Sequence, residues 1–280
     1  MILRIGLAYN PTMQASSGLL ERARAWCDGA GVERWDAPAG DQAAVLAQLP
    51  GTTALVVLGG DGTFLRAAQA VALIDVPLVG VNLGKVGFLS KAEADQLERV
   101  LGCLRAGDYT IEDRMALEVR IVRARGAPDP RVHVALNEAA VVRGAQTRVV
   151  RLRVAIDGSH LATYTADGVV VASPTGSTAY SFSAGGPIVD PTGRNLVVTT
   201  VAAYLTAIRS VVVDARRTVR VEVLAANSVL VSIDGHIELS LLPGDVVEVR
   251  ARERPVRFIE PREALAFWDL VRQKAQLLPS

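Results

Sequence analysis

A short apolar run at residues 54–58 ends in the order Gly-Gly-Asp-Gly, with Asp61 as the only charged residue of the turn. Residues 63–68 then have the spacing of a helix start. Because glycine lacks a Cβ, the main chain can turn sharply here and a bulky ligand can approach it closely. The pattern predicts that Asp61 lies at the carboxyl end of a strand, where open α/β sheets bind their ligands.

This turn has a functional and a structural interpretation. The free N–H groups and positive dipole end of the following helix favour a phosphate group. A carboxylate beside a phosphate is useful if it accepts a proton from an attacking hydroxyl or holds a metal ion. Asp-Gly turns that only cap a helix are also common, so both interpretations stay open for this run alone.

The first hundred residues alternate apolar strands with amphipathic helices. Strands are expected at residues 3–9, 54–58 and 77–82, and helices at residues 17–29, 41–49, 63–72 and 94–104. This alternation predicts an α/β domain with a parallel sheet and helices on its faces.

After residue 108 the segments become short and rich in β-branched residues. Strands are expected at residues 116–123, 132–136, 149–156, 196–201, 218–223, 229–233 and 246–251. They predict a β-rich, sandwich-like domain of mostly antiparallel sheet. Residues 262–278 return to helical periodicity with an apolar stripe. We therefore expect an α/β domain at 1–108, a β-rich domain at 109–258, and a carboxyl-terminal helix at 259–280 that packs back on the first domain.

The overall balance of charge narrows the class of protein. Half of the 280 residues are hydrophobic, 21% are charged, and the formal net charge is +1. This balance lacks the basic footprint of nucleic-acid binding. The sequence shows neither a membrane-spanning run nor a signal peptide, so we expect a cytoplasmic protein with no nucleic acid or membrane as partner. Cys27 and Cys103 fall in expected helices and are predicted to be free thiols.

A second unusual cluster begins at Asp167, where a predicted strand runs directly into a loop. Small hydroxyl side chains and one tyrosine crowd residues 173–183, and glycines follow. Such a loop offers short donors and acceptors to a polar ligand with many hydroxyls. The alternative is a surface loop that satisfies its own backbone. Asn137 and Glu138 form a third polar interruption after an apolar run, and alone they indicate a turn.

Taken together, these clusters have the order and spacing of the NAD kinase family, which the chain resembles over nearly its whole length. The matching segments are residues 58–68, 80–89, 112–115, 136–138, 167–187 and 232–236. The block that ends in Gly185, Gly186 and Pro187 is the most specific of them. The glycine-aspartate motif is shared with diacylglycerol and sphingosine kinases.

The resemblance implies a phosphotransferase that moves the terminal phosphate of ATP, or of polyphosphate in its place, to the 2′-hydroxyl on the adenosine ribose of NAD, giving NADP. It implies Mg²⁺ or another divalent metal ion as cofactor, although the sequence has no dense cluster of ligands for it. Relatives are commonly homodimers or homotetramers, with the active site between an α/β and a β-rich domain.

The resemblance also implies roles for single residues. Asp61 is the general base and Gly62 gives backbone access to the substrate. Asn137 and Glu138 hold NAD through its adenine amine and ribose hydroxyls, and Asp167 contacts the nicotinamide half. The dinucleotide loop comprises Thr178, Ala179, Tyr180, Ser181, Phe182 and Ser183. Further contacts to NAD are implied at Arg66, Arg148, Thr165, Ala202 and His236; for the two arginines a solvated surface charge is the alternative.

Two departures from the family pattern limit these assignments. Residues 201–209 lack the usual proline-histidine pair before a conserved arginine. This region in relatives contacts the dinucleotide and a neighbouring subunit. His236 stands where a glutamine is common, and a histidine can bring pH dependence. His133 and His160 have no companions at ligand spacing and are interpreted as structural or surface residues.

Three other classes of protein compete with this reading. A lipid kinase shares Asp61 but needs an apolar acceptor pocket, which the polar loop at 175–183 disfavours. A regulator that binds NAD without catalysis has no need of Asp61. A Rossmann dehydrogenase requires a G-x-G-x-x-G fingerprint after the first strand, and the sequence has none there.

Overall fold

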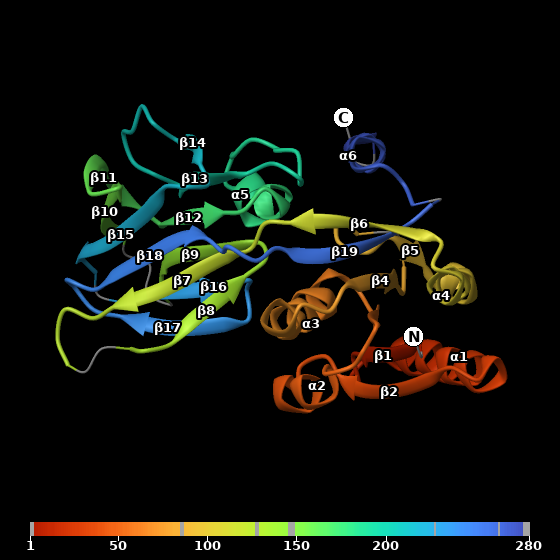
Figure 1. Ribbon diagram of the computed structural model, residues 1–280. Coiled ribbons are helices and arrows are strands. Elements are labelled where there is room, and N and C mark those ends of the chain that lie inside the picture. Colours follow the sequence, from red (N-terminus) through yellow and green to blue (C-terminus); the bar gives the residue numbers. More distant parts are fainter. Residues whose placement is uncertain are drawn as a thin grey trace. The chain divides into compact units, whose positions relative to one another are not determined.

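The computed structural model describes residues 3–84, 87–126, 129–144, 149–226, 228–262 and 264–276. In it, the apolar runs near the amino terminus form neighbouring strands of one sheet (Figure 1). The strand order is β2-β1-β3-β4-β19-β6, and β5 pairs with β4. Their bounds are β1 (Arg4–Tyr9), β2 (Glu33–Pro38), β3 (Ala54–Leu58), β4 (Leu78–Asn82), β5 (Ala92–Glu93), β6 (Tyr109–Arg114) and β19 (Val256–Pro261). β1 pairs in parallel with β2 and β3, and β4 with β3, β5 and β19, so the predicted α/β fold with a parallel sheet is confirmed.

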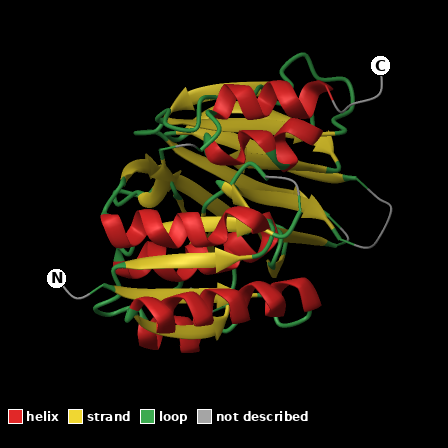
Figure 2. Cartoon of the chain, turned by 90° about the vertical axis from the view of Figure 1, so that its right-hand side faces the viewer, coloured by secondary structure: helices red, strands yellow, loops and turns green. Residues whose placement is uncertain are grey.

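Helices flank this sheet (Figure 2). They are α1 (Gln14–Ala30), α2 (Gln42–Gln48), α3 (Asp61–Ile74), η1 (Ala94–Gln96), α4 (Leu97–Ala106) and α6 (Phe267–Gln276). α1 packs with α4, and α2 packs with α3. Val56 and Leu58 of β3 share a core with α1 and α4, and since side chains alternate along a strand, Leu55 and Val57 face the other side.

The chain divides into two compact units. The first unit comprises Met1–Asp113 and Val256–Ser280, and the second comprises Arg114–Pro255. In the first unit, β1, β3 and β4 are parallel, so their carboxyl ends lie at one edge of the sheet. α2 and α3 begin at this edge, with Asp41 accepting a hydrogen bond from the Ala44 N–H (3.0 Å). α3 begins two residues earlier than predicted, which places Asp61 in its first turn.

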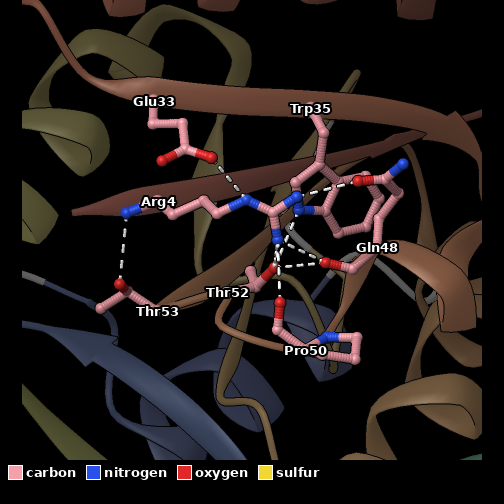
Figure 3. A network of polar contacts seen from close by, with 7 residues as sticks. All are labelled: Arg4, Glu33, Trp35, Gln48, Pro50, Thr52 and Thr53. Atoms are coloured by element: carbon pink, nitrogen blue, oxygen red, sulfur yellow. Dashed lines mark hydrogen bonds and ion pairs between the residues drawn. The ribbon is translucent and has the colours of Figure 1, made fainter. Parts of the chain in front are cut away.

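The amino end of β1 carries a polar network centred on Arg4 (Figure 3). Its guanidinium group donates to Glu33 of β2, to the side chain and carbonyl of Gln48, to the Pro50 carbonyl, and to the Thr52 hydroxyl. The Trp35 indole N–H donates to the same hydroxyl (2.8 Å). Because Gln48 ends α2, Arg4 satisfies carbonyl groups that the helix end leaves free.

The second unit consists of two antiparallel sheets. One has the order β11-β10-β15-β18-β7-β8 and the other β14-β13-β12-β9-β16-β17. The strands are β7 (Leu117–Val122), β8 (Val132–Ala135), β9 (Glu138–Arg143), β10 (Val150–Ile156), β11 (Ser159–Ala166), β12 (Gly168–Ala172), β13 (Asn195–Val201), β14 (Ser210–Asp214), β15 (Thr218–Ala225), β16 (Val229–Ile233), β17 (Ile237–Leu241) and β18 (Val246–Ala251). Their inward side chains form one apolar core, so the predicted sandwich-like fold is confirmed.

Two short helical turns follow β12, namely η2 (Thr175–Thr178) and α5 (Tyr180–Ser183). Cys27 is buried in α1, Cys103 is half-buried in α4, and both thiols are free as predicted. Within the described ranges, no helix combines the length and apolarity needed to cross a bilayer.

Candidate functional site

Asp61 lies in the first turn of α3, and a neighbouring segment of the same unit holds its carboxylate. Oδ2 accepts a hydrogen bond from the Phe88 N–H (3.0 Å). Oδ1 accepts from the Leu89 N–H (3.4 Å) and from the Ser90 hydroxyl (3.2 Å). These donors fix the carboxylate at the carboxyl edge of the sheet, with lone pairs left for a further partner.

The glycines around Asp61 differ in what the chain itself requires. A Cβ at Gly59 would overlap the Thr63 side chain, so packing excludes any other residue there. A Cβ at Gly62 would meet nothing within 4 Å, and this residue is exposed. Glycine inside a helix costs about 1 kcal/mol relative to alanine. The described part of the chain therefore gives no packing reason for Gly62, and its bare Cα would allow a ligand to approach closely.

An open pocket of about 690 Å³ lies at the same edge of the sheet. It is lined by Tyr9, Asn10, Pro11, Thr12, Pro38, Ala39, Gly40, Asp41, Gln42, Thr63 and Arg66. The first turns of α2 and α3 contribute to this lining, and Arg66 adds a positive charge. Helix N-termini and a guanidinium group together favour an anionic ligand such as a phosphate chain.

In the second unit, Asp234 holds the turn that leads from β8 into β9. Its carboxylate accepts hydrogen bonds from the backbone N–H groups of Leu136 (2.8 Å), Asn137 (2.8 Å) and Glu138 (3.1 Å). Asp234 follows β16, which runs antiparallel to β9, so the two ends meet at one edge of the sheet. A Cβ at Gly176 would overlap the Asn137 backbone, so this glycine lets η2 approach the same turn.

Three buried polar atoms around this turn have no hydrogen-bond partner among the described residues. They are Asn137 Oδ1, Glu138 Oε2 and His236 Nε2. His236 Nδ1 lies 2.9 Å from the Asp234 carbonyl, which can only accept, so Nδ1 carries a proton, and in the tautomer with this one ring proton Nε2 is an acceptor. Because an unpaired buried polar group is costly, this cluster suits a ligand that brings donors such as an amine and hydroxyls.

The two carboxyl groups of this cluster differ in the number of donors around them. Burial, together with the Asp234 carboxylate, raises the pKa of Glu138 to about 8, against the opposing hydrogen bond from the Tyr180 backbone. Burial also raises the pKa of Asp234, but the three backbone N–H groups oppose that rise. Three backbone N–H donors surround the Asp234 carboxylate, so the geometry favours the negative charge on Asp234 and the proton on Glu138.

The predicted dinucleotide loop forms η2 and α5 rather than an irregular loop. Tyr180 and Phe182 are exposed (39% and 48%) and can contact a ligand. The Ser181 hydroxyl is fully buried and pairs with Thr199 Oγ1 (3.0 Å), so it serves the packing of this unit. Thr178 and Ser183 donate to backbone carbonyls of their own turn. Ala179 is half-buried between the two turns.

Three further predicted residues lie together at the opposite end of β12. Asp167 precedes this strand and accepts from Arg143 Nε (2.8 Å). Ala202 follows β13 at a positive φ of 46°, and the Tyr204 N–H donates to the Thr165 carbonyl (2.9 Å). The five residues of β12 separate this group from Glu138 by roughly 16 Å, so only a long ligand reaches both. Arg148 lies outside the described residues.

No group of three or more His, Cys, Asp or Glu side chains that could hold a metal ion occurs in the part of the chain that the structure describes. Mg²⁺ in phosphoryl-transfer enzymes is usually bound by one or two carboxylates together with substrate phosphates.

Two parts of the site were not assigned a role from sequence. Asp234 belongs to an Asp-Gly pair after a strand, which indicates only a turn until the three N–H groups are placed around it. Residues 88–90 donate to Asp61 mainly through their main chain, which carries no sequence signal.

Comparisons with known proteins agree with this architecture. The family descriptions "ATP-NAD kinase N-terminal domain" and "ATP-NAD kinase C-terminal domain" match residues 20–109 and 136–261. An NAD kinase from Moorella thermoacetica is 43% identical over 221 residues, which cover 79% of this chain and 70% of that protein. An NAD kinase from Dehalococcoides mccartyi (strain CBDB1) is 33% identical over 262 residues, which cover 94% and 92%.

Two solved structures share the fold. The crystal structure of yeast NADH kinase complexed with NADH has a TM-score of 0.86 at 21% identity, covering 100% of this chain and 89% of that one. That of an NAD kinase from Archaeoglobus fulgidus in complex with ATP has a TM-score of 0.79 at 24% identity, covering 99% and 100%.

Proposed function

The chain belongs to the NAD kinase family, and we propose that Asp61 is the general base of its ATP-dependent phosphorylation of NAD. In this step the proton of the adenosine 2′-hydroxyl moves to the Asp61 carboxylate, and the freed oxygen bonds to the terminal phosphorus of ATP. The bond from that phosphorus to the bridging oxygen breaks, so that ADP leaves and NADP remains. The observation that carries the proposal is a carboxylate fixed in the first turn of α3 next to Gly62, where a Cβ would meet only open space.

The contribution of Asp61 to the rate of phosphoryl transfer is expected to be limited. Phosphoryl transfer gains mainly from positioning and from neutralisation of charge. A single general base therefore contributes roughly 100- to 10,000-fold. The rest of the rate must come from groups that orient the two substrates.

The second unit supplies the grip on NAD in this proposal. Asn137 Oδ1 and the Glu138 carboxyl face the adenine amine and ribose hydroxyls, and His236 Nε2 accepts from a further hydroxyl. Their lack of partners among the described residues supports this role. Asp167, Thr165 and Ala202 lie roughly 16 Å away along β12 and suit the nicotinamide half of an extended dinucleotide. Tyr180 and Phe182 offer exposed aromatic surface to it.

The donor nucleotide has a matching place in the first unit. The pocket of about 690 Å³ at the starts of α2 and α3 suits the phosphate chain of ATP, with Arg66 and Thr63 as polar contacts. Mg²⁺, when bound with ATP, neutralises charge on the transferring phosphate. The absence of a metal-ligand cluster among the described residues fits delivery of that ion by the nucleotide.

We also propose that the protein assembles as a homodimer or homotetramer through the free edge of β14. This strand ends its sheet, and Val212 on it is 49% exposed. Tyr204 and Leu205, just before it, are 72% and 88% exposed. An unpaired edge next to exposed apolar side chains is a ready surface for a second copy. Light scattering should report a multimer for the parent and a smaller species for Leu205→Asp.

The catalytic proposal is tested by NADP formation from NAD, ATP and Mg²⁺ with purified protein. We expect Asp61→Asn to lose at least about 100-fold in kcat while its Kd for NAD stays within about threefold. Asp75→Asn, at the other end of α3, is the matched control and should keep full activity. Equal kcat for parent and Asp61→Asn would remove Asp61 from this role. No product from either protein would favour a regulator that only binds NAD.

Gly62→Ala separates ligand approach from folding. Alanine should raise the free energy of unfolding by about 1 kcal/mol, because the helix gains a better former and no atom lies in the way. Activity should nevertheless fall by about tenfold or more, since the new methyl group occupies space that the substrate needs. Full activity together with higher stability would exclude close substrate contact at Gly62.

A further inference from the structure

Phe88 connects the main chain that holds Asp61 to the carboxyl-terminal helix of the same unit. Its N–H donates to Asp61 Oδ2 (3.0 Å). Its ring lies 6.2 Å from the ring of Phe267, the first residue of α6. The ammonium group of Lys274, two turns further along α6, lies 5.0 Å from the centroid of the Phe88 ring. Two side chains of one helix therefore fix the side chain whose backbone donates to the carboxylate.

The other end of this segment is anchored to β19. The Ser90 hydroxyl donates to Asp61, and this residue is fully buried. The next residue, Lys91, forms an ion pair with Glu260 of β19 (2.8 Å), and both side chains are largely buried. A Cβ at Gly80 would overlap Ser90 Cα, so glycine lets β4 and this segment approach closely. Both anchors, β19 and α6, come from the last 25 residues of the chain.

Residues 87–90 also restrict the movement of the Asp61 side chain. A Cβ at Gly87 would overlap the Asp61 carboxylate itself. The carboxylate is thus seated between the bare Cα of Gly87 and the three donors of residues 88–90. A shift of this segment would move or release the carboxylate, whereas the first turn of α3 could stay in place.

We propose that Phe88, clamped by Phe267 and Lys274 of α6, is a positioning residue that sets the orientation of the Asp61 carboxylate for proton abstraction. This inference rests on the proposed role of Asp61 as general base. It gives the carboxyl-terminal helix α6 a role in the chemical step, although α6 carries none of the residues that contact NAD or ATP in the proposed function.

The first test removes the clamp in graded steps. Phe88→Ala keeps the backbone N–H but loses the ring, and it should lower kcat about tenfold or more. Lys274→Met should lower kcat by about two- to fivefold, and Lys274→Arg should restore it, because a guanidinium also stacks on an aromatic ring. The matched control is Arg272→Met, which removes a positive charge from the same helix where it pairs with Asp269. KM for NAD should stay within about twofold in all four variants, since the dinucleotide grip is untouched.

The second test asks whether the loss passes through Asp61. In the Asp61→Asn background, Phe88→Ala should change kcat by less than about twofold, because residues that act as one unit are not additive. Gly87→Ala should behave in the same way, with a large loss in the parent and almost none in Asp61→Asn. If Phe88→Ala fails to fold, Gly87→Ala and Lys274→Met carry the same cycle.

The outcomes separate this inference from the function on which it rests. Full activity of Asp61→Asn would overturn the general base itself. A large loss in Asp61→Asn, combined with equal effects of Phe88→Ala and Gly87→Ala in both backgrounds, would overturn only the positioning role. Loss of kcat in Arg272→Met equal to that in Lys274→Met would also overturn it.

Discussion

The Arg4 network of the first unit and the Asn137 turn of the second are both dense in polar groups, but they differ in how those groups are satisfied. All three guanidinium nitrogens of Arg4 donate to partners within the chain (Figure 3). Around Asn137, three buried polar atoms have none among the described residues. A closed network stabilises the fold, whereas an open one keeps hydrogen bonds for a ligand. The predictions below test this difference.

The largest expected effect is on the pH dependence of stability, through Glu138. Burial raises its pKa to about 8 in the folded protein, whereas the unfolded chain releases the proton near 4.5. Between these values the folded state binds the extra proton, so the free energy of unfolding falls as pH rises. Relative to Glu138→Gln, the parent should lose on the order of 4 kcal/mol between pH 4.5 and 8. Chemical denaturation of both proteins across this range measures it, and parallel profiles would contradict a protonated Glu138.

Removing Arg4 should affect stability alone. Arg4→Met loses five side-chain hydrogen bonds, including those to the Pro50 carbonyl and the Gln48 side chain, while the Gln48 carbonyl keeps its bond from the Thr52 hydroxyl. We expect a loss of about 2–4 kcal/mol in the free energy of unfolding. At a temperature where the variant is folded, kcat and KM should stay within about twofold of the parent. A selective rise in KM for NAD would show that this network also serves binding.

Removing Glu138 should weaken NAD binding and leave stability almost unchanged. Glu138→Ala removes a carboxyl group whose Oε2 has no partner among the described residues, so at about pH 4, below the range in which the raised pKa of Glu138 costs stability, the free energy of unfolding should change by less than about 1 kcal/mol. KM for NAD should rise about 10- to 100-fold, as expected when a buried hydrogen bond to substrate is lost. Calorimetric titration with NAD checks the loss directly. Unchanged affinity with reduced stability would make this cluster structural like the Arg4 network.

The smallest effect is expected at His236. Glutamine offers an acceptor at a similar reach, so His236→Gln should change KM for NAD by less than about threefold. His236→Ala, which lacks any acceptor, should raise KM by about five- to tenfold. If steady-state kinetics show the two variants to be equally impaired, the Nε2 acceptor has no role in binding.

Much of the first unit follows from its sequence because its signals are local. The predicted strand at 54–58 has the bounds of β3, and α3 is longer than the predicted helix at 63–72 by two residues at each end, with Gly60 rather than Gly62 preceding it. β2 was not predicted because it has only two buried side chains, Trp35 and Ala37, among the charged residues Glu33, Arg34 and Asp36. β19 was not predicted because it pairs with β4, a strand more than 170 residues away in the sequence.

The site of the second unit was predictable in its residues but less so in its geometry. Asn137 and Glu138 look like a turn in the sequence. In the structure the chain there leaves β8 in one sheet and enters β9 in the other. Which side chains of residues 173–183 face a ligand depends on tertiary packing, so the sequence could not distinguish buried Ser181 from exposed Tyr180 and Phe182. Arg148 and a cytoplasmic location stay predictions.

The most direct test of the account is the rate of a single turnover at saturating NAD and ATP. Rapid quenching of parent and Asp61→Asn isolates phosphoryl transfer from substrate binding and product release. The account predicts that NADP forms roughly 100- to 10,000-fold more slowly in Asp61→Asn. Equal single-turnover rates would show that another group, or none, removes the proton from the ribose, and would contradict the assignment of Asp61.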